Sequence, residues 1–404
     1  MTHAEPGQRD AKFARISSSR GALGPLNAFA GGALPTTILS CCAGALLPLL
    51  STAAALPLRA ACREAAAAIA QHPWEDSATV IHGSVGAWRA CFPRARAANV
   101  SQAGGGELAS ALRVAPMVDA DFVHLAGLRI LLMQRCTSVS DAAFVHLRGI
   151  RLLDMSHCPQ DGITDAAFAH LRGIHSLNMS FCSQAGVTAA AFVHLRGIHT
   201  LKMSHCFQPG ISDAAFAHLR GLHTLHMSGC RQVTDAAFTH LRSIHTLFMN
   251  HCSQPSVTDA AFAHLRGVHS LSMSGCRQAG ITDAAFAHLS GIHSLNMSDC
   301  SQDGITDAAF SHLRGIHSLD MGDCSQAGIT DAAFAHLRGI HSLGMKGCDQ
   351  AGITDAAFEH LRGVRVLDLQ DCVQLNAEGS FGVNARECFR LQTCRQLDEI
   401  HCCN

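Results

Sequence analysis

Hydrophobic and polar positions between residues 115 and 375 recur with a fixed period. The period is easiest to measure on cysteine. Eleven cysteines follow one another at spacings of 24 residues, or of 22 in two steps: Cys136, Cys158, Cys182, Cys206, Cys230, Cys252, Cys276, Cys300, Cys324, Cys348 and Cys372. A sequence period between about 20 and 50 residues is typical of a solenoid, in which each unit stacks on its neighbours. We therefore expect each unit to hold one or two short elements and a return path.

The unit at 163–182 reads ITDAAFAHLRGIHSLNMSFC. Its Thr-Asp pair favours the start of a helix, where Asp165 also complements the positive end of the helix dipole. Apolar residues follow at helical spacing until Gly173, which suits the left-handed position after a helix. Beyond it, Leu177 and Met179 alternate with polar residues, as in a strand with one buried face. Each unit is predicted to be a short helix, a turn, a short strand and a cysteine corner.

The order Ile174, Leu177, Met179 and Cys182, followed by a Val-Thr pair, is similar to leucine-rich repeats of the cysteine-containing class. The resemblance covers roughly residues 115–375. It implies an α/β solenoid, an arc of about eleven units of 22–24 residues with parallel strands on the concave side and helices outside.

Composition and charge narrow the possible functions. The chain has 48% hydrophobic residues and a formal net charge of −1. No segment carries the strongly basic charge that nucleic-acid binding usually needs, so we expect no nucleic-acid partner. The sequence shows no nucleophile elbow, phosphate loop, zinc-protease helix or glycine-rich dinucleotide turn. We therefore expect no catalytic residues and no cofactor.

The 19 cysteines could indicate a secreted disulfide protein. Eleven of them stand at the same corner of each unit, however, where a thiol fits as a small buried residue that donates to a backbone carbonyl of the turn. A reduced intracellular protein is the interpretation that this placement favours. The cysteine-rich end, Cys388 to Cys403, matches no common zinc spacing and is interpreted as a cap or tail.

The 27 histidines form two series. One series belongs to the helices: His124, His146, His170, His194, His218, His240, His264, His288, His312, His336 and His360. The other precedes the strands: His175, His199, His223, His245, His269, His293, His317 and His341. Zinc takes three or four ligands around one point, and a straight column offers two neighbours at most, so we interpret both series as structural and expect no metal. A helix imidazole could accept a hydrogen bond from an arginine of the Arg172 type in the adjacent unit.

The N-terminal hundred residues differ from the repeats. No charged residue occurs from Gly21 to Leu58, and residues 38–58 have the length of a membrane span. Four basic residues precede this stretch, so a signal anchor or a cleaved signal is one interpretation. Pro48, Pro57 and the alanine-rich character argue against it, so we do not expect a membrane segment here. A plain N-terminal cap is another alternative.

A further interpretation rests on the order of motifs between residues 34 and 75. Leu34–Pro35 is followed by a leucine-rich stretch, by Cys62–Arg63 and by Trp74. This order resembles an F-box. The resemblance implies that the segment binds the adaptor subunit of a ubiquitin ligase through Leu34, Pro35, Ile38, Leu39, Leu46, Leu47, Leu49, Leu50 and Leu58.

Variation among the repeats gathers in two columns, the position of Asn178 and the position of Phe181. Both are predicted to face the concave side because Leu177 and Met179 point inward. Such variation is expected of a binding surface that diversified after duplication, and drift at exposed positions is the alternative. The substrate-binding residues predicted on this basis are Arg135, Asp154, His157, Asn178, Phe181, Lys202, His205, His226, Phe248, His251, Asn296, Asp299, Asp320, Asp323, Asp368 and Asp371.

Together these inferences divide the chain into four parts. Residues 1–30 form an N-terminal disordered segment, 31–100 an F-box-like helical domain and cap, 101–375 the solenoid, and 376–404 a C-terminal cap or tail. The resemblance implies the substrate-recognition subunit of a cullin-RING ubiquitin ligase, with an unknown protein substrate on the concave face. The location would be the cytoplasm or nucleus, of the host cell if the source is viral. The alternative is a leucine-rich repeat binding protein, membrane-anchored or secreted, without a ubiquitin role.

Overall fold

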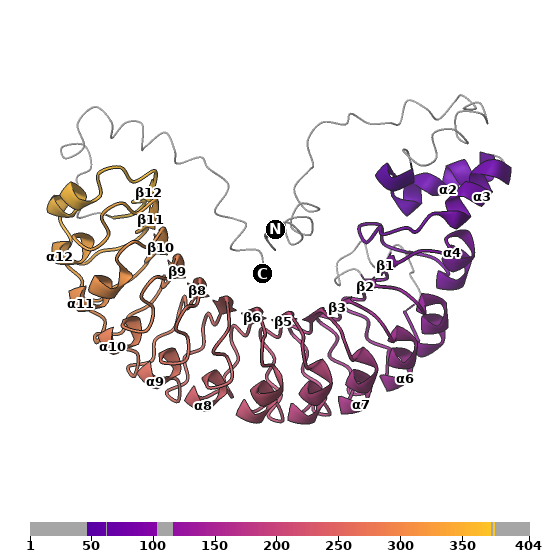
Figure 1. Cartoon of the computed structure of the whole chain (residues 1–404), viewed down its shortest axis with the longest axis horizontal. Coiled ribbons are helices and arrows are strands. Elements are labelled where there is room, and N and C mark those ends of the chain that lie inside the picture. Colours follow the sequence, from indigo (N-terminus) through magenta and orange to yellow (C-terminus); the bar gives the residue numbers. More distant parts are fainter. Residues whose placement is uncertain (1–46, 62, 103–115, 373–374, 376–404) are drawn as a thin grey trace, which may run out of the picture.

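The computed structural model describes residues 47–61, 63–102, 116–372 and 375. Within them the chain forms an arc with strands on the inner side and helices on the outer side (Figure 1). The predicted α/β solenoid of stacked repeats is confirmed at this level.

One parallel sheet of 12 strands follows the inside of the arc in sequence order. Neighbouring strands pair position for position, with Leu177 opposite Leu201 and Asn178 opposite Lys202. The strands are β1 (Ala97–Asn99), β2 (Ile130–Leu132), β3 (Leu152–Asp154), β4 (Ser176–Asn178), β5 (Thr200–Lys202), β6 (Thr224–His226), β7 (Thr246–Phe248), β8 (Ser270–Ser272), β9 (Ser294–Asn296), β10 (Ser318–Asp320), β11 (Ser342–Gly344) and β12 (Val366–Asp368). Equivalent residues of different units therefore form continuous columns along the arc.

The outer layer consists of α-helical and 3-10 turns. They are η5 (Asp119–Leu125), α6 (Asp141–Phe144), η6 (Val145–Leu147), α7 (Asp165–Phe168), η7 (Ala169–Leu171), η8 (Ala189–Leu195), η9 (Asp213–His218), α8 (Asp235–Phe238), α9 (Asp259–Phe262), α10 (Asp283–Phe286), α11 (Asp307–Phe310), η10 (Ser311–Leu313), α12 (Asp331–Phe334) and η11 (Asp355–His360). In α7 the Thr164 hydroxyl caps the helix by accepting from the Ala166 amide. Gly173 ends the outer segment at a φ of 79°, as the sequence predicts.

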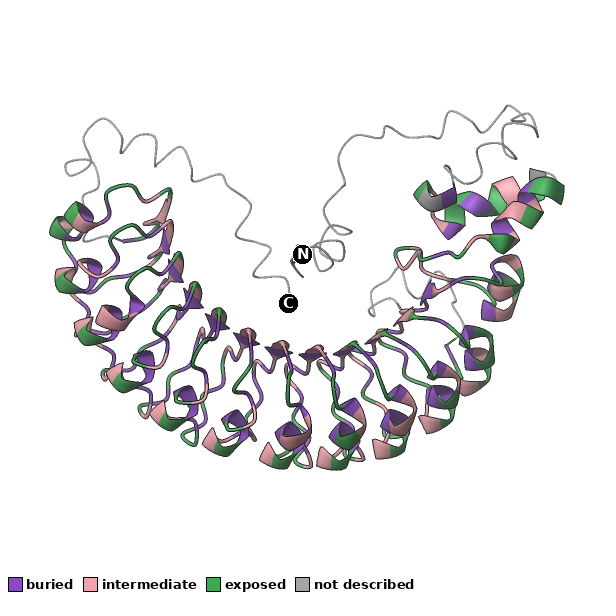
Figure 2. Ribbon diagram, viewed as in Figure 1, coloured by how far each residue is buried: buried purple, intermediate pink, exposed green. Residues whose placement is uncertain are grey.

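The core lies between the two layers (Figure 2). In the unit at 163–182, Phe168, Leu177, Met179 and Cys182 all have 0% exposure. The same four positions are buried in almost every unit, so each unit completes its core only against its neighbours.

The cysteine column behaves as predicted. Each thiol donates to the carbonyl oxygen of a residue in the preceding unit, as Cys182 Sγ does to Met155 O at 3.2 Å. All twelve cysteines in the described part of the chain are free thiols. Burial raises the pKa of Cys182 to about 11 and that of Cys230 to about 12, so these thiols stay protonated and unreactive at neutral pH.

Both histidine series form ladders. The strand-entrance imidazoles stack face to face, with ring centroids of His293 and His317 4.5 Å apart. Helix imidazoles accept from the arginine of the preceding unit, as His194 Nδ1 does from Arg172 Nε at 3.3 Å. The predicted arginine–imidazole hydrogen bond is thus present, and it recurs at His170, His288, His336 and His360.

Two further ladders connect the units, and the sequence analysis does not anticipate either. The first joins helix starts: Asp165 Oδ1 accepts from the Thr188 amide and its Oδ2 from the Thr188 hydroxyl, both at 2.7 Å. The second is a column of buried glutamines, in which Gln254 Nε2 donates to Cys230 O at 3.1 Å. The aspartates satisfy the helix-start amide and hydroxyl of the next unit. The glutamine ladder is partial, because Gln254 and Gln302 donate in this way whereas both polar side-chain atoms of Gln208, Gln326 and Gln350 have no hydrogen-bond partner among the described residues.

The N-terminal part of the described chain closes the first repeat. It contains η4 (Leu47–Leu49), α2 (Thr52–Ala61), α3 (Arg63–Gln71) and α4 (Val85–Cys91), and β1 extends the sheet by one strand beyond the eleven repeats. Trp74 is 1% exposed, its ring packs edge-on against Phe92 at 5.3 Å, and its Nε1 donates to Ile69 O. Trp74 and Phe92 thus belong to one core that continues into the solenoid.

Among the described residues, no helix is long and apolar enough to span a membrane. The predicted segments 1–30 and 376–404 lie outside the described residues.

Candidate functional site

The inner face of the sheet presents two side-chain columns to solvent. In most strands the middle residue, such as Leu177, is buried, while the residues on either side of it are partly exposed. Alternation along a strand explains this, because successive side chains point to opposite faces. The Asn178 column lies on the concave face, as predicted, and the Ser176 column lies beside it.

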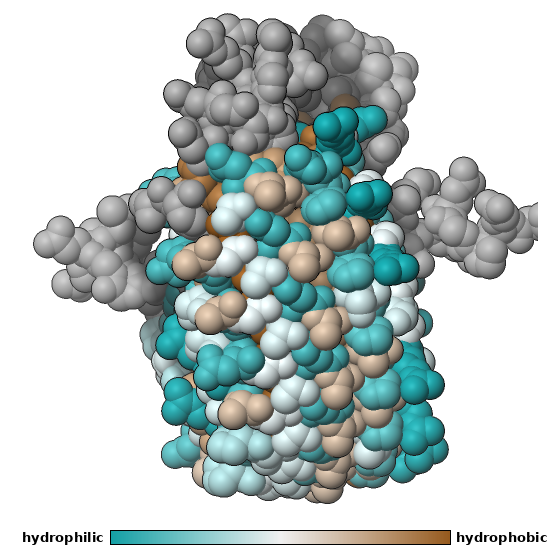
Figure 3. All heavy atoms as spheres, turned by 90° about the vertical axis from the view of Figure 1, so that its left-hand side faces the viewer, coloured by the Kyte–Doolittle hydropathy of each residue, from teal (hydrophilic) through white to brown (hydrophobic). Residues whose placement is uncertain are grey.

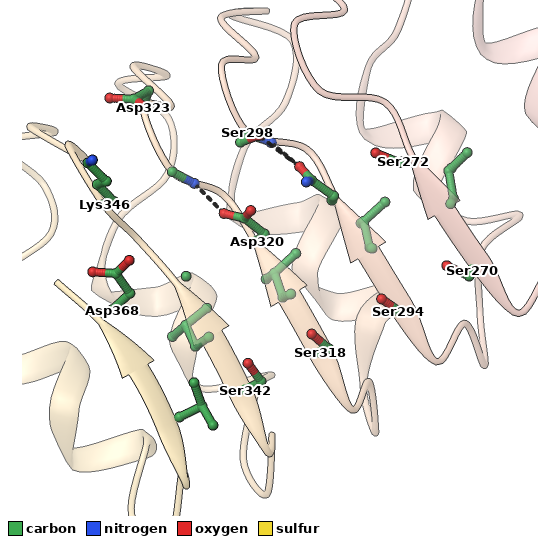
Figure 4. A pocket seen from close by; sticks show the side chains of 18 of the residues that line it. Ser270, Ser272, Ser294, Ser298, Ser318, Asp320, Asp323, Ser342, Lys346 and Asp368 are labelled. Carbon is green, nitrogen blue, oxygen red and sulfur yellow. Dashed lines mark hydrogen bonds between the residues drawn. The ribbon is translucent and has the colours of Figure 1, made fainter. Parts of the chain in front are cut away.

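A groove of about 400 Å³ runs over the C-terminal half of this face, across strands β7 to β12. Its lining includes Phe248, Asn296, Asp320, Asp323 and Asp368 from the predicted set. It also includes Lys346 and the serines of the strand starts, Ser270, Ser294, Ser318 and Ser342. Hydroxyls, carboxylates and one ammonium group gather around this hollow (Figure 4).

Hydrogen bonds hold the polar side chains of the groove in place. Asp320 Oδ1 accepts from the Gly322 amide at 3.0 Å, and Asp368 Oδ1 accepts from the Gln370 amide at 3.0 Å. Asn296 Oδ1 accepts from both the amide and the hydroxyl of Ser298. An Asp or Asn in this column therefore caps the turn after its strand, which is a structural reason for its presence.

The second predicted column, the position of Phe181, lies in the turn after each strand. All eleven residues there have a positive φ, including Phe181 at 59°, Asp299 at 55° and Gly229 at 71°. Gly, Asp, Asn and His tolerate this conformation better than most residues, so backbone geometry accounts for much of the column's composition. Of this column, only Asp323 lines the groove.

Phe181 and Arg135 are the departures from that preference. The Phe181 ring is 37% exposed and stacks between two imidazoles, with centroid distances of 4.4 Å to His157 and 4.7 Å to His205. His205 in turn meets the edge of Phe207, which is 56% exposed. Phe181 is a surface residue here, held by aromatic neighbours and not by the core.

Basic and aromatic side chains lie at the N-terminal end of the groove and on the strands before it. The Phe248 ring stacks on His226 with centroids 4.2 Å apart. Burial, followed by the positive charge of Lys202, lowers the pKa of His226 to about 4, so this imidazole is neutral at physiological pH. Burial, followed by Arg135, also lowers the pKa of His157.

The structure describes only some of the predicted adaptor contacts. Leu34, Pro35, Ile38, Leu39 and Leu46 lie outside the described residues. Leu47 is 3% exposed, and its side chain lies in the chain's own core. Leu50 and Leu58 pack partly against that core, whereas Leu49 is 77% exposed.

Sequence reasoning missed Lys346 and the strand-start serines. The strand-start position is Ser or Thr in eight of the eleven units, and serine in four consecutive units of the groove, so a search for variable columns passes over it. Lys346 stands where most units have serine, and comparison of that third column would have found it.

Within the described residues, no group of three or more His, Cys, Asp or Glu side chains is placed to hold a metal ion.

No family model and no curated protein matches the sequence. Solved structures do match in fold. One is Toll from Drosophila in complex with Spatzle, at a TM-score of 0.53 and 15% identity over 70% of this chain and 42% of that chain. Another is TLR13 in complex with an RNA, ssRNA13, at a TM-score of 0.53 and 19% identity over 71% of this chain and 44% of that chain. The chain spans less than half the length of these proteins, and the shared feature is the leucine-rich repeat fold.

Proposed function

We propose that this chain is a non-enzymatic binding protein and that the groove across strands β7 to β12 holds a segment of another protein. The observation that carries the proposal is the groove itself, where variable residues such as Asn296, Asp320 and Asp368 stand among near-identical repeats. The surrounding positions are fixed by the ladders, so variation is concentrated where the sheet meets solvent.

The lining indicates what kind of segment would fit. Three carboxylates, Asp320, Asp323 and Asp368, line the groove together with one ammonium group, Lys346. The serine hydroxyls can donate to and accept from an extended backbone. Phe248 offers an aromatic surface at one end of the groove, and aromatic residues often dominate binding energy. A partner segment with basic side chains and one apolar side chain complements this lining.

The test compares recovery of partners from cell lysate by the native chain, by the Phe248→Ser and Asp320→Asn double variant, and by a Val123→Ser control. Val123 lies in the outer layer and is 52% exposed. We expect specific partners to be lost only with the groove variant, while its thermal midpoint stays close to native. Partners that remain bound to the groove variant would refute the proposal.

We further propose that residues 34–58 recruit a ubiquitin-ligase adaptor, which would make the chain the substrate-recognition subunit of a cullin-RING ligase. Support comes from the F-box-like order of motifs and from two exposed apolar side chains, Leu49 at 77% and Leu56 at 45%. The buried free thiols agree with a reducing location such as the cytoplasm or nucleus.

The adaptor proposal has its own test. The change Leu49→Asp should abolish capture of the adaptor, because an exposed leucine loses its apolar contact and gains a charge. A Val123→Asp variant places the same charge on the outer layer and should leave capture unchanged. If the native chain captures no adaptor, the hypothesis of a ubiquitin role is wrong. The alternative hypothesis is then a leucine-rich repeat binding protein without that role.

A further inference from the structure

The net charge of −1 conceals a separation of charge between the two broad sides of the arc. Strands pair along the arc and helices lie outside them (Figure 1). The strand axis is perpendicular to the direction of strand pairing and to the direction from the sheet to the helices. It therefore runs along the direction of view in Figure 1. All strand starts therefore reach one broad side, and all strand ends reach the other.

The side with the strand starts is basic. In each unit, the segment from the helix histidine to the strand lies on this side; in one unit it is residues 170–177, HLRGIHSL. None of the eleven copies of this segment contains Asp or Glu. These segments carry 12 arginines, here called the basic rim: Arg129, Arg148, Arg151, Arg172, Arg196, Arg220, Arg242, Arg266, Arg314, Arg338, Arg362 and Arg365. Both histidine ladders lie in the same segments.

The opposite side is acidic. The segments from the repeat cysteine to the helix start carry 12 aspartates and two arginines, Arg231 and Arg277. The aspartates are Asp141, Asp161, Asp165, Asp213, Asp235, Asp259, Asp283, Asp303, Asp307, Asp331, Asp349 and Asp355. A side view of the arc shows hydrophilic residues along both of its borders (Figure 3).

The arginines of the basic rim are available for a ligand. Nine of these arginines, such as Arg172, stand directly before the glycine or serine of the turn, and all nine are exposed. Most of their contacts are single hydrogen bonds to a neighbouring imidazole. An imidazole that accepts in this way is neutral and leaves the guanidinium its charge and further donors. Acids next to these segments include Glu359, beside His360, and Asp121, three residues before His124. Glu75 pairs with Arg96 at 3.7 Å in the N-terminal cap.

A hollow of about 570 Å³ lies on this rim between two units. It is lined by Arg220, Gly221, Thr239, His240, Arg242 and Ser243. Two guanidinium groups around one hollow suit a phosphate group, which arginine binds through paired hydrogen bonds.

We propose that the basic rim docks the protein on an anionic phospholipid surface. The charge extends over a curved band on one broad side, and a flat membrane can contact the whole band at once, whereas a nucleic acid or an acidic peptide would follow only part of it. Docking by this side leaves the concave groove open, so the proposal is independent of what the groove binds. It also differs from the sequence-based expectation of no membrane partner, which depended only on whether residues 38–58 could span a membrane.

The test is sedimentation of the full chain with vesicles of phosphatidylcholine alone or with phosphatidylserine. The test variant is Arg196→Gln, Arg220→Gln and Arg242→Gln together. The control removes the same charge from the opposite side of the strands, with Arg135→Gln, Arg231→Gln and Arg277→Gln. Each basic residue at such a surface contributes roughly fivefold, so the rim variant should bind anionic vesicles on the order of 100-fold more weakly.

The native chain and the control should bind anionic vesicles alike, and salt should weaken both. Thermal melts check that the variants fold. The salt dependence of vesicle binding by the native chain tests the electrostatic contribution without any mutation. Equal losses in both variants, or equal binding to neutral vesicles, would overturn the proposal. Binding of single-stranded RNA or an acidic peptide without vesicle binding would also overturn it.

Discussion

Two sets of columns run along the same solenoid and follow opposite rules. The columns that join units, such as the aspartates of the Asp165 type, hardly vary, and each has a contact in the next unit that requires its chemistry. The concave columns, such as that of Asn178, change from unit to unit. Residues that make contacts between stacked units are the same in nearly every repeat. Residues that differ between repeats lie at positions that contribute little to the stacking of units.

The largest expected effect comes from removing adjacent members of a joining column. The double variant Asp235→Ala and Asp259→Ala leaves the amides and hydroxyls of Thr258 and Thr282 without their acceptors. We expect a loss of about 1–2 kcal/mol of unfolding free energy at each site, measured by urea denaturation. Asp303→Ala removes an exposed carboxylate from the same side and should cost much less; equal losses would mean that the ladder adds nothing.

Acidification should act on another joining column, the strand-entrance histidines. Burial and the charge of His223 lower the pKa of His245, while burial and the charges of His269 and His317 lower that of His293. The unfolded chain therefore binds more protons at these sites than the folded chain. Stability is complete above the unfolded pKa of about 6.5 and falls as pH drops through the lowered folded values.

Thermal midpoints at neutral pH and near pH 5 measure this effect, and salt should reduce it by screening like charges. Replacing His245 and His293 with Asn should make the midpoint less sensitive to pH. A native midpoint that is the same at both pH values would show that the stacked imidazoles do not interact electrostatically.

A smaller effect, of opposite sign, is expected where the aspartate column is naturally interrupted. Ala189 stands at the aspartate position, and the helix that Ser212 caps lacks the side-chain cap bond seen in its neighbours. Ala189→Asp would supply acceptors for the Ser212 amide and hydroxyl and place a carboxylate at a helix start. We expect a gain of about 1 kcal/mol. A loss of stability would indicate that residue 189 does not lie opposite Ser212 in the way that the other aspartates lie opposite their threonines.

Much of the fold can be predicted from the sequence because its main features depend on patterns of nearby residues. The period, the helix start at Thr164, the turn at Gly173 and the buried cysteine corner each depend on a few consecutive residues. The aspartate–threonine and glutamine ladders join residues more than 20 positions apart, and nothing local distinguishes such an aspartate from an ordinary helix-start residue.

The site was predicted less completely, for a related reason. Variation identified the Asn178 column, but it also pointed to the Phe181 column, where the left-handed backbone restricts composition. The strand-start serines and Lys346 line the groove because of the geometry of the sheet. Variation within one column of residues does not reveal that geometry.

The most direct test of the concave binding surface is site-specific crosslinking. A photo-crosslinking amino acid would replace Ser318 in the groove or, as a control, Val145 in the outer layer, which is 46% exposed. The chain would then be irradiated in lysate and the adducts identified by mass spectrometry. We predict a discrete adduct at position 318 that disappears when Phe248→Ser is added and has no counterpart at position 145. The same adducts at both positions, or an adduct at 318 that is indifferent to Phe248, would contradict the account.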